Sequence, residues 1–452
     1  MNRNFRCTLT VLFFSIIKTA SAQEALKQYI DEALENNLVL KERKISLDKS
    51  FVALKEARSL FLPTTWFDGQ YTLAKGGRSI DIPVGDLLNP VYKTLNQLTA
   101  TNEFPTVSNK SEPLLPNNFY DARIKTTMPI VNPDIRINRD IKQQQVALQQ
   151  NEVDIYKREL VKQVKMAYYE YLLAGEGVRI YQSAVQVVNE NLKINQSLLA
   201  NGKGLPAYVS RAESEVKRVE SQVQNAVNEQ QNAKAYFNFL LNKPLEDSII
   251  VNEISLDQGV FPLTVATVDN VSAREELKSL DISRDINANV LKMNRSFRTP
   301  RLNAFLDLAS QGYDFKVNDK SLFYLGGVQL QVPIFSGKRN LYKIEQTKLD
   351  AQTIGLITST TKQELQLAAS VSKNNAGSAY LNYQAAIKQQ ESSEKYFKLI
   401  NKGYREGVNT FIEFLDARNQ LTNSQLQVNI SKYKALTAVA DYERQTASYS
   451  FK

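Results

Sequence analysis

The chain has 452 residues, with 56 lysines and arginines against 47 aspartates and glutamates, a single cysteine and no histidine. It therefore lacks the commonest general base and any zinc site built on several cysteines, and it contains neither a G-x-x-x-x-G-K-[ST] phosphate loop nor a G-x-G-x-x-G turn. We predict no enzyme activity, no catalytic residue, no metal and no cofactor, and no nucleic-acid binding, because the small basic excess is spread along the chain.

The first 22 residues predict a secretory signal peptide. Two arginines precede an apolar run that begins at Cys7, and residues 20–22 form an A-x-A cleavage site. The mature chain then begins at Gln23 and contains no cysteine. No later segment approaches the roughly 18 consecutive apolar residues of a membrane-crossing helix. Any membrane crossing is therefore expected to use strands.

An internal repeat of about 200 residues organises the mature chain. Pro129-Ile130-Val131 and Pro333-Ile334-Phe335 each end an alternating run, and the glycine breaks at Gly204 and Gly407 have nearly the same offset. Each repeat is expected to contain a helix, two strands, a long helix and a return helix. The first repeat is predicted to cover 23–242, with an opening helix at 23–60, a β-hairpin at 64–128, a long helix at 133–200 and a return helix at 205–242. An equatorial linker is predicted at 243–270. The second repeat is predicted to cover 271–452, with an opening helix at 272–294, a β-hairpin at 299–332, a long helix at 339–402 and a return helix at 408–447.

The long segments have the 4,3 spacing of apolar residues that is typical of coiled coils. In the first long helix this spacing runs from Leu160 to Leu199, and Asn195 is its one plainly polar position. The other three long segments have the same spacing. A helix over 133–200 would be on the order of 100 Å long, which no globular core requires. The helices alone leave open a rod-like coiled coil.

The predicted strands favour a different architecture. Apolar and polar residues alternate over 121–128 and again over 322–332, and weaker partner strands are expected at 64–73 and 302–309. Four strands are too few to close a barrel, and an open sheet edge is not tolerated in lipid. We therefore expect a mainly α chain with a transmembrane β-barrel contribution, in which three identical chains share twelve strands and a tube of twelve helices.

Residues 74–118 join the strands of the first hairpin and are rich in glycine and proline. This composition predicts a long external loop. Within this loop, the apolar residues over 86–98 have weak helical spacing. Such a helix could cover the mouth of the barrel or pack against its own loop. We expect self-packing. The residues that carry the spacing are Leu87, Leu88, Val91, Tyr92 and Leu95.

The order of elements, the P-I-V and P-I-F strand ends and the glycine breaks together resemble the TolC-type outer-membrane efflux proteins. The resemblance covers essentially all of the mature chain. It implies a homotrimer in outer-membrane lipid that extends into the periplasm and works with a periplasmic adaptor and an inner-membrane transporter. Such a duct would pass small molecules or proteins outward in a tripartite efflux or type I secretion system. The alternative is a trimeric coiled-coil structural or adhesive surface protein.

The resemblance also implies site residues near the glycine breaks. Lys203-Gly204-Leu205 and Glu406-Gly407-Val408 correspond to the tips that adaptors grip, although tight turns alone also favour glycine. Glu413 and Asp416 are three residues apart on one helical face, so a trimer would place six carboxylates around one axis. A first-turn acid that complements the helix dipole is the other explanation. The predicted docking residues are Gly202, Lys203, Gly204, Leu205, Gly403, Glu406, Gly407 and Val408, and the predicted gate residues are Glu413, Asp416 and Tyr404.

Overall fold

The computed structural model describes residues 24–251 and 270–451. The predicted signal peptide (1–22) and most of the predicted equatorial linker (243–270) lie outside these residues. No helix in the described ranges combines the length and the apolar composition that a membrane span requires. The chain forms two compact units: a helical unit of residues 24–51, 144–251, 270–287 and 349–451, and a strand unit of residues 52–143 and 288–348.

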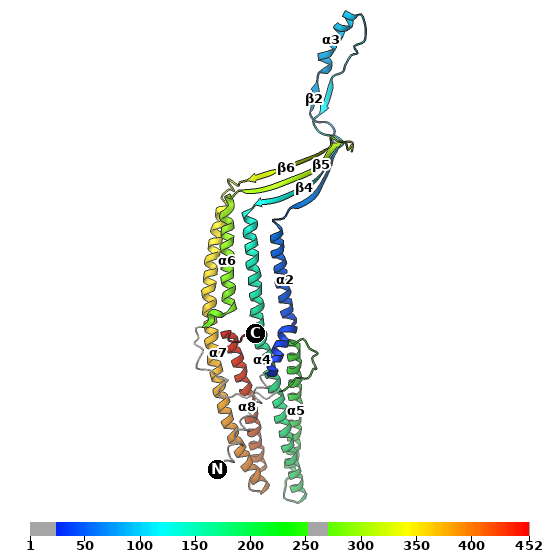
Figure 1. Cartoon of the computed structure of the whole chain (residues 1–452). Coiled ribbons are helices and arrows are strands. Elements are labelled where there is room, and N and C mark those ends of the chain that lie inside the picture. The colour runs from blue at the N-terminus through cyan, green and yellow to red at the C-terminus, as the bar shows by residue number, and fades with distance from the viewer. Residues whose placement is uncertain (1–23, 252–269, 452) are drawn as a thin grey trace, which may run out of the picture. The chain divides into compact units, whose positions relative to one another are not determined.

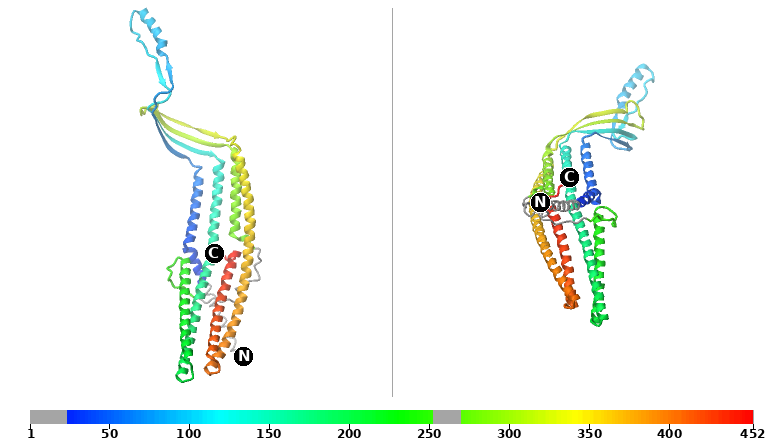
Figure 2. Two further views of the ribbon diagram at one scale, coloured as in Figure 1. Left: turned by 180° about the vertical axis from the view of Figure 1, so that it is seen from behind. Right: turned by 60° about the horizontal axis from the view of Figure 1, so that its bottom comes forward.

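Four long helices dominate the helical unit. Helix α4 (Pro133–Ala200) pairs with α5 (Pro206–Leu240), and α7 (Arg339–Arg405) pairs with α8 (Phe411–Thr446) (Figures 1 and 2). A buried cluster that includes Val188 and Val219 joins α4 to α5. Many of the predicted 4,3 positions lie in the packed core, although the core also contains Tyr168, Val153 and Leu172, which are outside that pattern. The predicted 4,3 positions that are buried include Leu160, Val164, Val188, Val216, Val219, Phe237, Leu365, Ala369, Phe414 and Ala417.

The opening helix is not the continuous helix that the sequence predicts over 23–60. A helix over 24–36 ends at Asn37, and α2 (Leu38–Ser59) follows. The Oδ1 atom of the buried Asn37 accepts a hydrogen bond from the backbone N–H of Leu40 at 3.0 Å, as an N-cap does. Its Nδ2 atom donates to the carbonyl of Leu240 at 2.9 Å. A tertiary hydrogen bond thus accompanies the break, and hydrophobic periodicity does not reveal such a bond.

A network of charged side chains joins the start of α6 (Glu275–Arg295), which follows η1 (Asn270–Ala273), to the end of α8. The buried Arg274 donates from Nη1 to the carbonyls of Arg444 and Gln445 at 3.1 and 2.7 Å. Its Nη2 atom lies 2.7 Å from a carboxylate oxygen of Glu276, which also accepts from Arg444 at 2.9 Å. Arg274 therefore adds a donor at the end of α8, where the last carbonyls of a helix have no partner within the helix.

This network predicts a dependence of stability on pH. Burial acts to raise the pKa of Glu276, but hydrogen bonds from Arg274 and Arg444 outweigh it and hold the pKa at about 2. A depressed carboxyl pKa stabilises the fold above the ordinary value and loses that contribution as pH falls through the depressed one. We expect Glu276→Gln to destabilise the protein by about 3 kcal/mol at pH 7. The difference from wild type should shrink between about pH 4.5 and 2.

Denaturant unfolding at several pH values, followed by helical circular dichroism, measures this dependence. Glu391→Gln is the matched control, because Glu391 forms an exposed ion pair with Lys388. Such surface pairs contribute little to stability. A stability difference between Glu276→Gln and wild type that stayed constant as the pH was lowered would contradict the prediction.

The strand unit is built on an antiparallel sheet in the order β1-β4-β5-β6. Its strands are β1 (Thr64–Thr72), β4 (Phe119–Val131), β5 (Arg301–Tyr313), which follows η2 (Ser296–Arg298), and β6 (Leu322–Gln331). The pairing of β4 with β5 joins the strands of the two predicted hairpins. Facing residues across the strands share one face of a sheet. One cross-strand row is Phe67, Ile124, Leu308 and Tyr324, and the next is Asp68, Arg123, Ala309 and Phe323.

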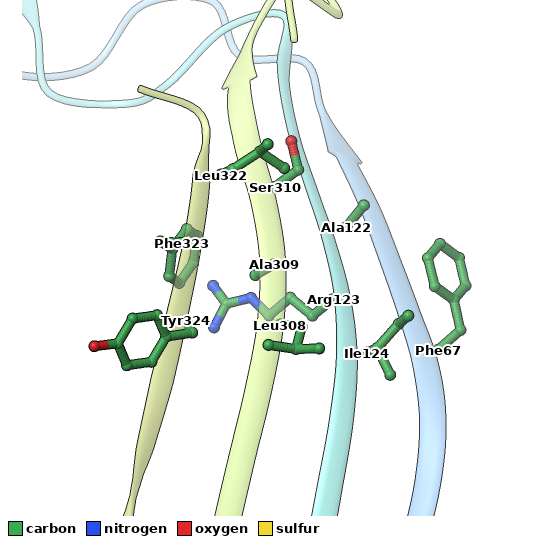
Figure 3. A pocket seen from close by; sticks show the side chains of 10 residues that line it. All are labelled: Phe67, Ala122, Arg123, Ile124, Leu308, Ala309, Ser310, Leu322, Phe323 and Tyr324. Atoms are coloured by element: carbon green, nitrogen blue, oxygen red, sulfur yellow. The ribbon is translucent and has the colours of Figure 1, made fainter. Parts of the chain in front are cut away.

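The two faces of this sheet differ in chemistry, as the alternation over 121–128 predicts. On the charged face Arg123 binds Asp121 with an Nε–Oδ1 distance of 2.6 Å, and Lys125 binds Asp68 at 2.6 Å. The Arg123 guanidinium lies 5.9 Å from the centre of the Phe323 ring (Figure 3). A shallow hollow of about 530 Å³ on the sheet is lined by Phe67, Ala122, Arg123, Ile124, Leu308, Ala309, Ser310, Leu322, Phe323 and Tyr324 (Figure 3).

The segment between β1 and β4 is more regular than the predicted loop. It contains β2 (Ser79–Ile82), α3 (Val84–Thr99) and β3 (Lys110–Pro113), and β2 pairs with β3. Helix α3 is longer than the weak helical spacing over 86–98 indicates.

Candidate functional site

The first helix break has the geometry of a capped turn. Gly202 follows the end of α4 with a φ of +69°, a conformation that favours glycine. The backbone N–H of Lys203 donates to the carbonyl of Leu198 at 2.8 Å and so satisfies one of the last helical carbonyls. Leu205 is extended, and Pro206 occupies the first turn of α5, where its missing N–H has no cost. The turn therefore reverses the chain within a few residues.

The second break lies further along the chain than the sequence predicts. Helix α7 does not end at residue 402 but continues through Gly403 to Arg405, and α8 begins at Phe411 rather than at 408. Gly407 is the residue with positive φ, at +78°. Gly403 serves another purpose, because a Cβ atom there would lie 2.0 Å from Oδ1 of Asn409. Its lack of a side chain lets the returning turn approach the helix.

The two breaks lie at the same end of the helical unit (Figures 1 and 2). Both present exposed apolar and charged side chains. Leu205 is 55% exposed and Val408 is 78% exposed. Lys203 and Glu406 are also exposed, whereas the predicted docking residues Gly204 and Gly403 are partly buried. Each turn thus carries one apolar and one charged side chain in contact with solvent.

The predicted gate residue Tyr404 connects two helical pairs. Its hydroxyl donates to Oδ1 of Asn195 at 3.1 Å, so that α7 is joined to α4. The ring is 8% exposed and lies 5.1 Å from that of Phe414 and 6.2 Å from that of Phe411. Burial raises the pKa of Tyr404, so it stays a neutral donor. The polar position in the coiled-coil seam, Asn195, is therefore the partner of this tyrosine.

Glu413 and Asp416 lie on one exposed face of α8 but have different surroundings. Glu413 is part of a capping box, in which its carboxylate accepts from the backbone N–H of Thr410 at 2.6 Å. This bond, with bonds from the Thr410 hydroxyl and Asn409, lowers the pKa of Glu413. Asp416 accepts from Gln420 at 2.8 Å. Glu413 therefore caps the start of α8, and both carboxylates remain open to solvent.

Sequence reasoning missed an ion pair close to these acids. The side chain of Arg418 on α8 is 3% exposed and binds Glu215 on α5, whose side chain is 14% exposed. Arg218 also reaches Glu215, and it contacts Asn419 at 3.0 Å. Burial lowers the pKa of Arg418 to about 10, so it is still charged at neutral pH. A basic residue in the apolar face of α8 is the signal that could have revealed it.

The model of the family described as outer membrane efflux protein matches residues 29–243 and 274–444, which is most of the chain. The chain belongs to the outer membrane efflux protein family. No curated protein matches this chain significantly.

Solved structures of outer membrane channels have the same fold as this efflux protein. The CmeC channel of Campylobacter jejuni is 16% identical, with a TM-score of 0.74 over 94% of this chain and 85% of that one. The VceC outer membrane protein of Vibrio cholerae is 14% identical, with a TM-score of 0.72 over 95% and 97%. The open MtrE channel of Neisseria gonorrhoeae is 14% identical, with a TM-score of 0.71 over 93% and 88%.

Family membership confirms several predictions about this efflux protein. It is an outer-membrane efflux duct of tripartite systems, it extends from the outer membrane into the periplasm, and it is not an enzyme. Channels of this family work with adaptors and inner-membrane pumps. The alternative of an adhesive coiled-coil protein has no support.

Proposed function

We propose that three copies of this efflux protein close one twelve-stranded barrel and one twelve-helix tube. We also propose that each chain is an internal duplication, in which residues 271–452 repeat the order of elements in 23–242 and the two repeats are joined by the linker at 243–270. The observation that carries the proposal is the open sheet, whose edge strands in the described chain are β1 and β6. Such edges cannot stay unpaired in lipid. Pairing β6 of each copy with β1 of the next removes them. The strands have 9 to 13 residues, which meets the requirement of about 9–11 residues for a tilted membrane strand.

The chemistry of the two sheet faces supports this assembly. The row of Phe67, Ile124, Leu308 and Tyr324 is apolar and exposed, with exposed fractions from 48% to 79%. Such a face suits contact with outer-membrane lipid. The opposite face carries Arg123 and Lys125 with their acidic partners, and would face a water-filled lumen. Lumen charges in ion pairs would let cargo of either sign pass.

The exposed acids on α8 are proposed to form the constriction of the tube. Three copies of Glu413 and Asp416 would place six carboxylates around the symmetry axis, which favours cations. Tyr404 would hold the constriction closed through its bond to Asn195, because that bond joins α7 to α4. The depressed pKa of Glu413 supports this role, since the carboxylate then stays charged in mildly acidic conditions.

The two breaks are proposed to be the docking tips for a periplasmic adaptor, which connects the duct to an inner-membrane transporter. The exposed Leu205 and Val408 supply apolar contacts, and Lys203 and Glu406 supply charges. Gly202, Gly204, Gly403 and Gly407 then act by keeping the tips narrow. Small molecules or proteins would pass from the pump to the exterior.

Planar-bilayer conductance tests the constriction. We expect the wild-type trimer to pass a small, cation-selective current. Glu413→Gln combined with Asp416→Asn should increase the current several-fold and reduce its cation selectivity, because six charges leave the pore. Glutamine still accepts the capping hydrogen bond from Thr410, so the helix start is preserved.

The matched control is Glu391→Gln with Glu394→Gln, a pair of exposed acids with the same spacing on α7. This control should leave both current and selectivity unchanged. Native mass spectrometry of the same samples reports the subunit number. Trimers whose selectivity does not respond to the α8 variants would exclude the acidic constriction, and a chain that stays monomeric would exclude the shared barrel.

A further inference from the structure

The segment between β1 and β4 folds as a hairpin in which α3 packs against its returning chain on one side (Figures 1 and 2). Asn89 exchanges two hydrogen bonds with the backbone of Val107, at 2.9 and 2.8 Å. Asn96 exchanges two with the backbone of Phe104, at 2.9 and 3.1 Å. Gly85 completes this side, because a Cβ atom there would lie 2.3 Å from the Val107 carbonyl oxygen. The prediction of self-packing therefore describes this side of the helix.

Another side of α3 is an apolar stripe without a partner within the described chain. Leu87, Val91 and Leu98 are 69%, 52% and 78% exposed. A solvent-facing helix side normally carries polar residues, so a stripe of this kind indicates a contact surface. The stripe consists of Val84, Leu87, Leu88, Val91, Leu95 and Leu98.

The charge of the hairpin argues against a membrane surface as the occupant of the stripe. Helices that lie on lipid are rich in lysine and arginine on their polar side. Helix α3 has one base, Lys93, and one acid, Asp86. Residues 74–118 as a whole have four basic and four acidic residues, so the hairpin carries no net charge. Nothing here would attract it to an anionic headgroup layer.

The spacing of the stripe instead fits a second copy of itself. Five of its residues, Val84, Leu88, Val91, Leu95 and Leu98, follow the 4,3 pattern of a coiled-coil seam. Such a seam packs against a matching seam on another helix, and a second copy of α3 supplies one. The hairpin also continues directly from β1, the edge strand at which the proposed trimer would be joined. Identical stripes would therefore be brought near one another.

The base of the hairpin is held in place by aromatic rings. Phe315, in the turn between β5 and β6, stacks on Tyr71 at 4.7 Å and on Tyr120 at 5.7 Å between ring centres. The Tyr71 hydroxyl donates to Oδ1 of Asn118 at 3.1 Å. Above this base, Gly76 and Gly77 have positive φ values of +80° and +99°. Two glycines therefore connect the hairpin to this base.

We propose that the α3 helices of three copies pack through their stripes into a short three-helix coiled coil that caps the external mouth of the duct. The inference rests on the proposed trimer. The hairpin joins β1 to β4 at the strand ends remote from α2 and α4, which is the external end in that assembly. Because the barrel tethers the three helices, their effective concentration is high, which favours the association of a seam that is only two heptads long.

Cysteine cross-linking tests the cap, because the mature chain is predicted to contain no other cysteine. We would introduce Leu98→Cys and, separately, Val91→Cys into the full chain and oxidise the purified trimers. The matched control is Lys93→Cys, which lies on the polar side of the same helix. We expect several-fold more disulfide-linked dimer from the stripe positions than from Lys93→Cys, with two of the three chains of a trimer linked at most.

Three outcomes would overturn the cap. Trimers that give no more dimer at Leu98→Cys and Val91→Cys than at Lys93→Cys would exclude packing between the helices and leave the proposed duct standing. A nitroxide at Leu98→Cys that is relaxed by oxygen and shielded from aqueous reagents, without cross-linking, would place the stripe on lipid. A monomeric chain would overturn both the proposed trimer and the cap, so the two failures are distinguishable.

Discussion

Replacing Arg274 by alanine is expected to lower the free energy of unfolding by about 3–5 kcal/mol, the cost of breaking a buried ion pair. The Arg274 side chain is 3% exposed and lies 2.7 Å from Glu276. Without it, Glu276 keeps only Arg444 as a cationic partner among the bonds described above. The carbonyl of Gln445, at the end of α8, loses this donor as well, whereas the carbonyl of Arg444 keeps the backbone N–H of Ala447 at 3.4 Å.

Urea unfolding of the purified duct, followed by helical circular dichroism, measures this loss. Arg284→Ala is the control, because Arg284 also lies on α6 and pairs with Asp281, but both side chains are more than half exposed. Its effect should stay within about 1 kcal/mol. Equal stabilities of Arg274→Ala and Arg284→Ala would show that the network does not hold α6 to α8.

Removing Glu215 is expected to have a second large effect, of about 3–5 kcal/mol, because it leaves a buried guanidinium without its carboxylate. The Arg418 side chain is 3% exposed, and its Nε atom already has no hydrogen-bond partner in the described part of the chain. Burial lowers its pKa to about 10, which shows how poorly the site solvates the charge. Glu215→Ala should therefore weaken the contact between α5 and α8.

A compensating double variant separates the effect of the unpaired charge from that of packing. Glu215→Leu combined with Arg418→Met should recover most of the loss, because apolar residues of similar size can replace a buried ion pair at little cost. Glu220→Ala is the control on α5, since Glu220 forms an exposed pair with Lys217. A double variant as unstable as Glu215→Ala would mean that packing, rather than the unpaired charge, causes the loss.

Periodicity determined much of the architecture of this efflux protein in advance. The apolar seam through Leu160 and Val164 predicts a long helix, and the helix lies at 133–200 as expected. Strict alternation predicts two chemically different sheet faces, and the register places Ile124 beside Leu308. Such patterns are readable because burial repeats with the geometry of each element. The glycine breaks and the family resemblance indicated where the functional residues lie. The acidic constriction and the docking tips stay predictions.

Only the tertiary structure decided what interrupts or supplements these patterns. Asn37 ends a helix whose periodicity continues, because Leu240 offers its amide a carbonyl. Gly403 stays within α7 because it is needed for close approach by Asn409 rather than for a turn. Asn195 receives Tyr404, and Arg418 finds Glu215, about 200 residues away in both cases. A repeating pattern encodes which side of an element is buried, whereas a specific polar partner exists only once distant helices meet.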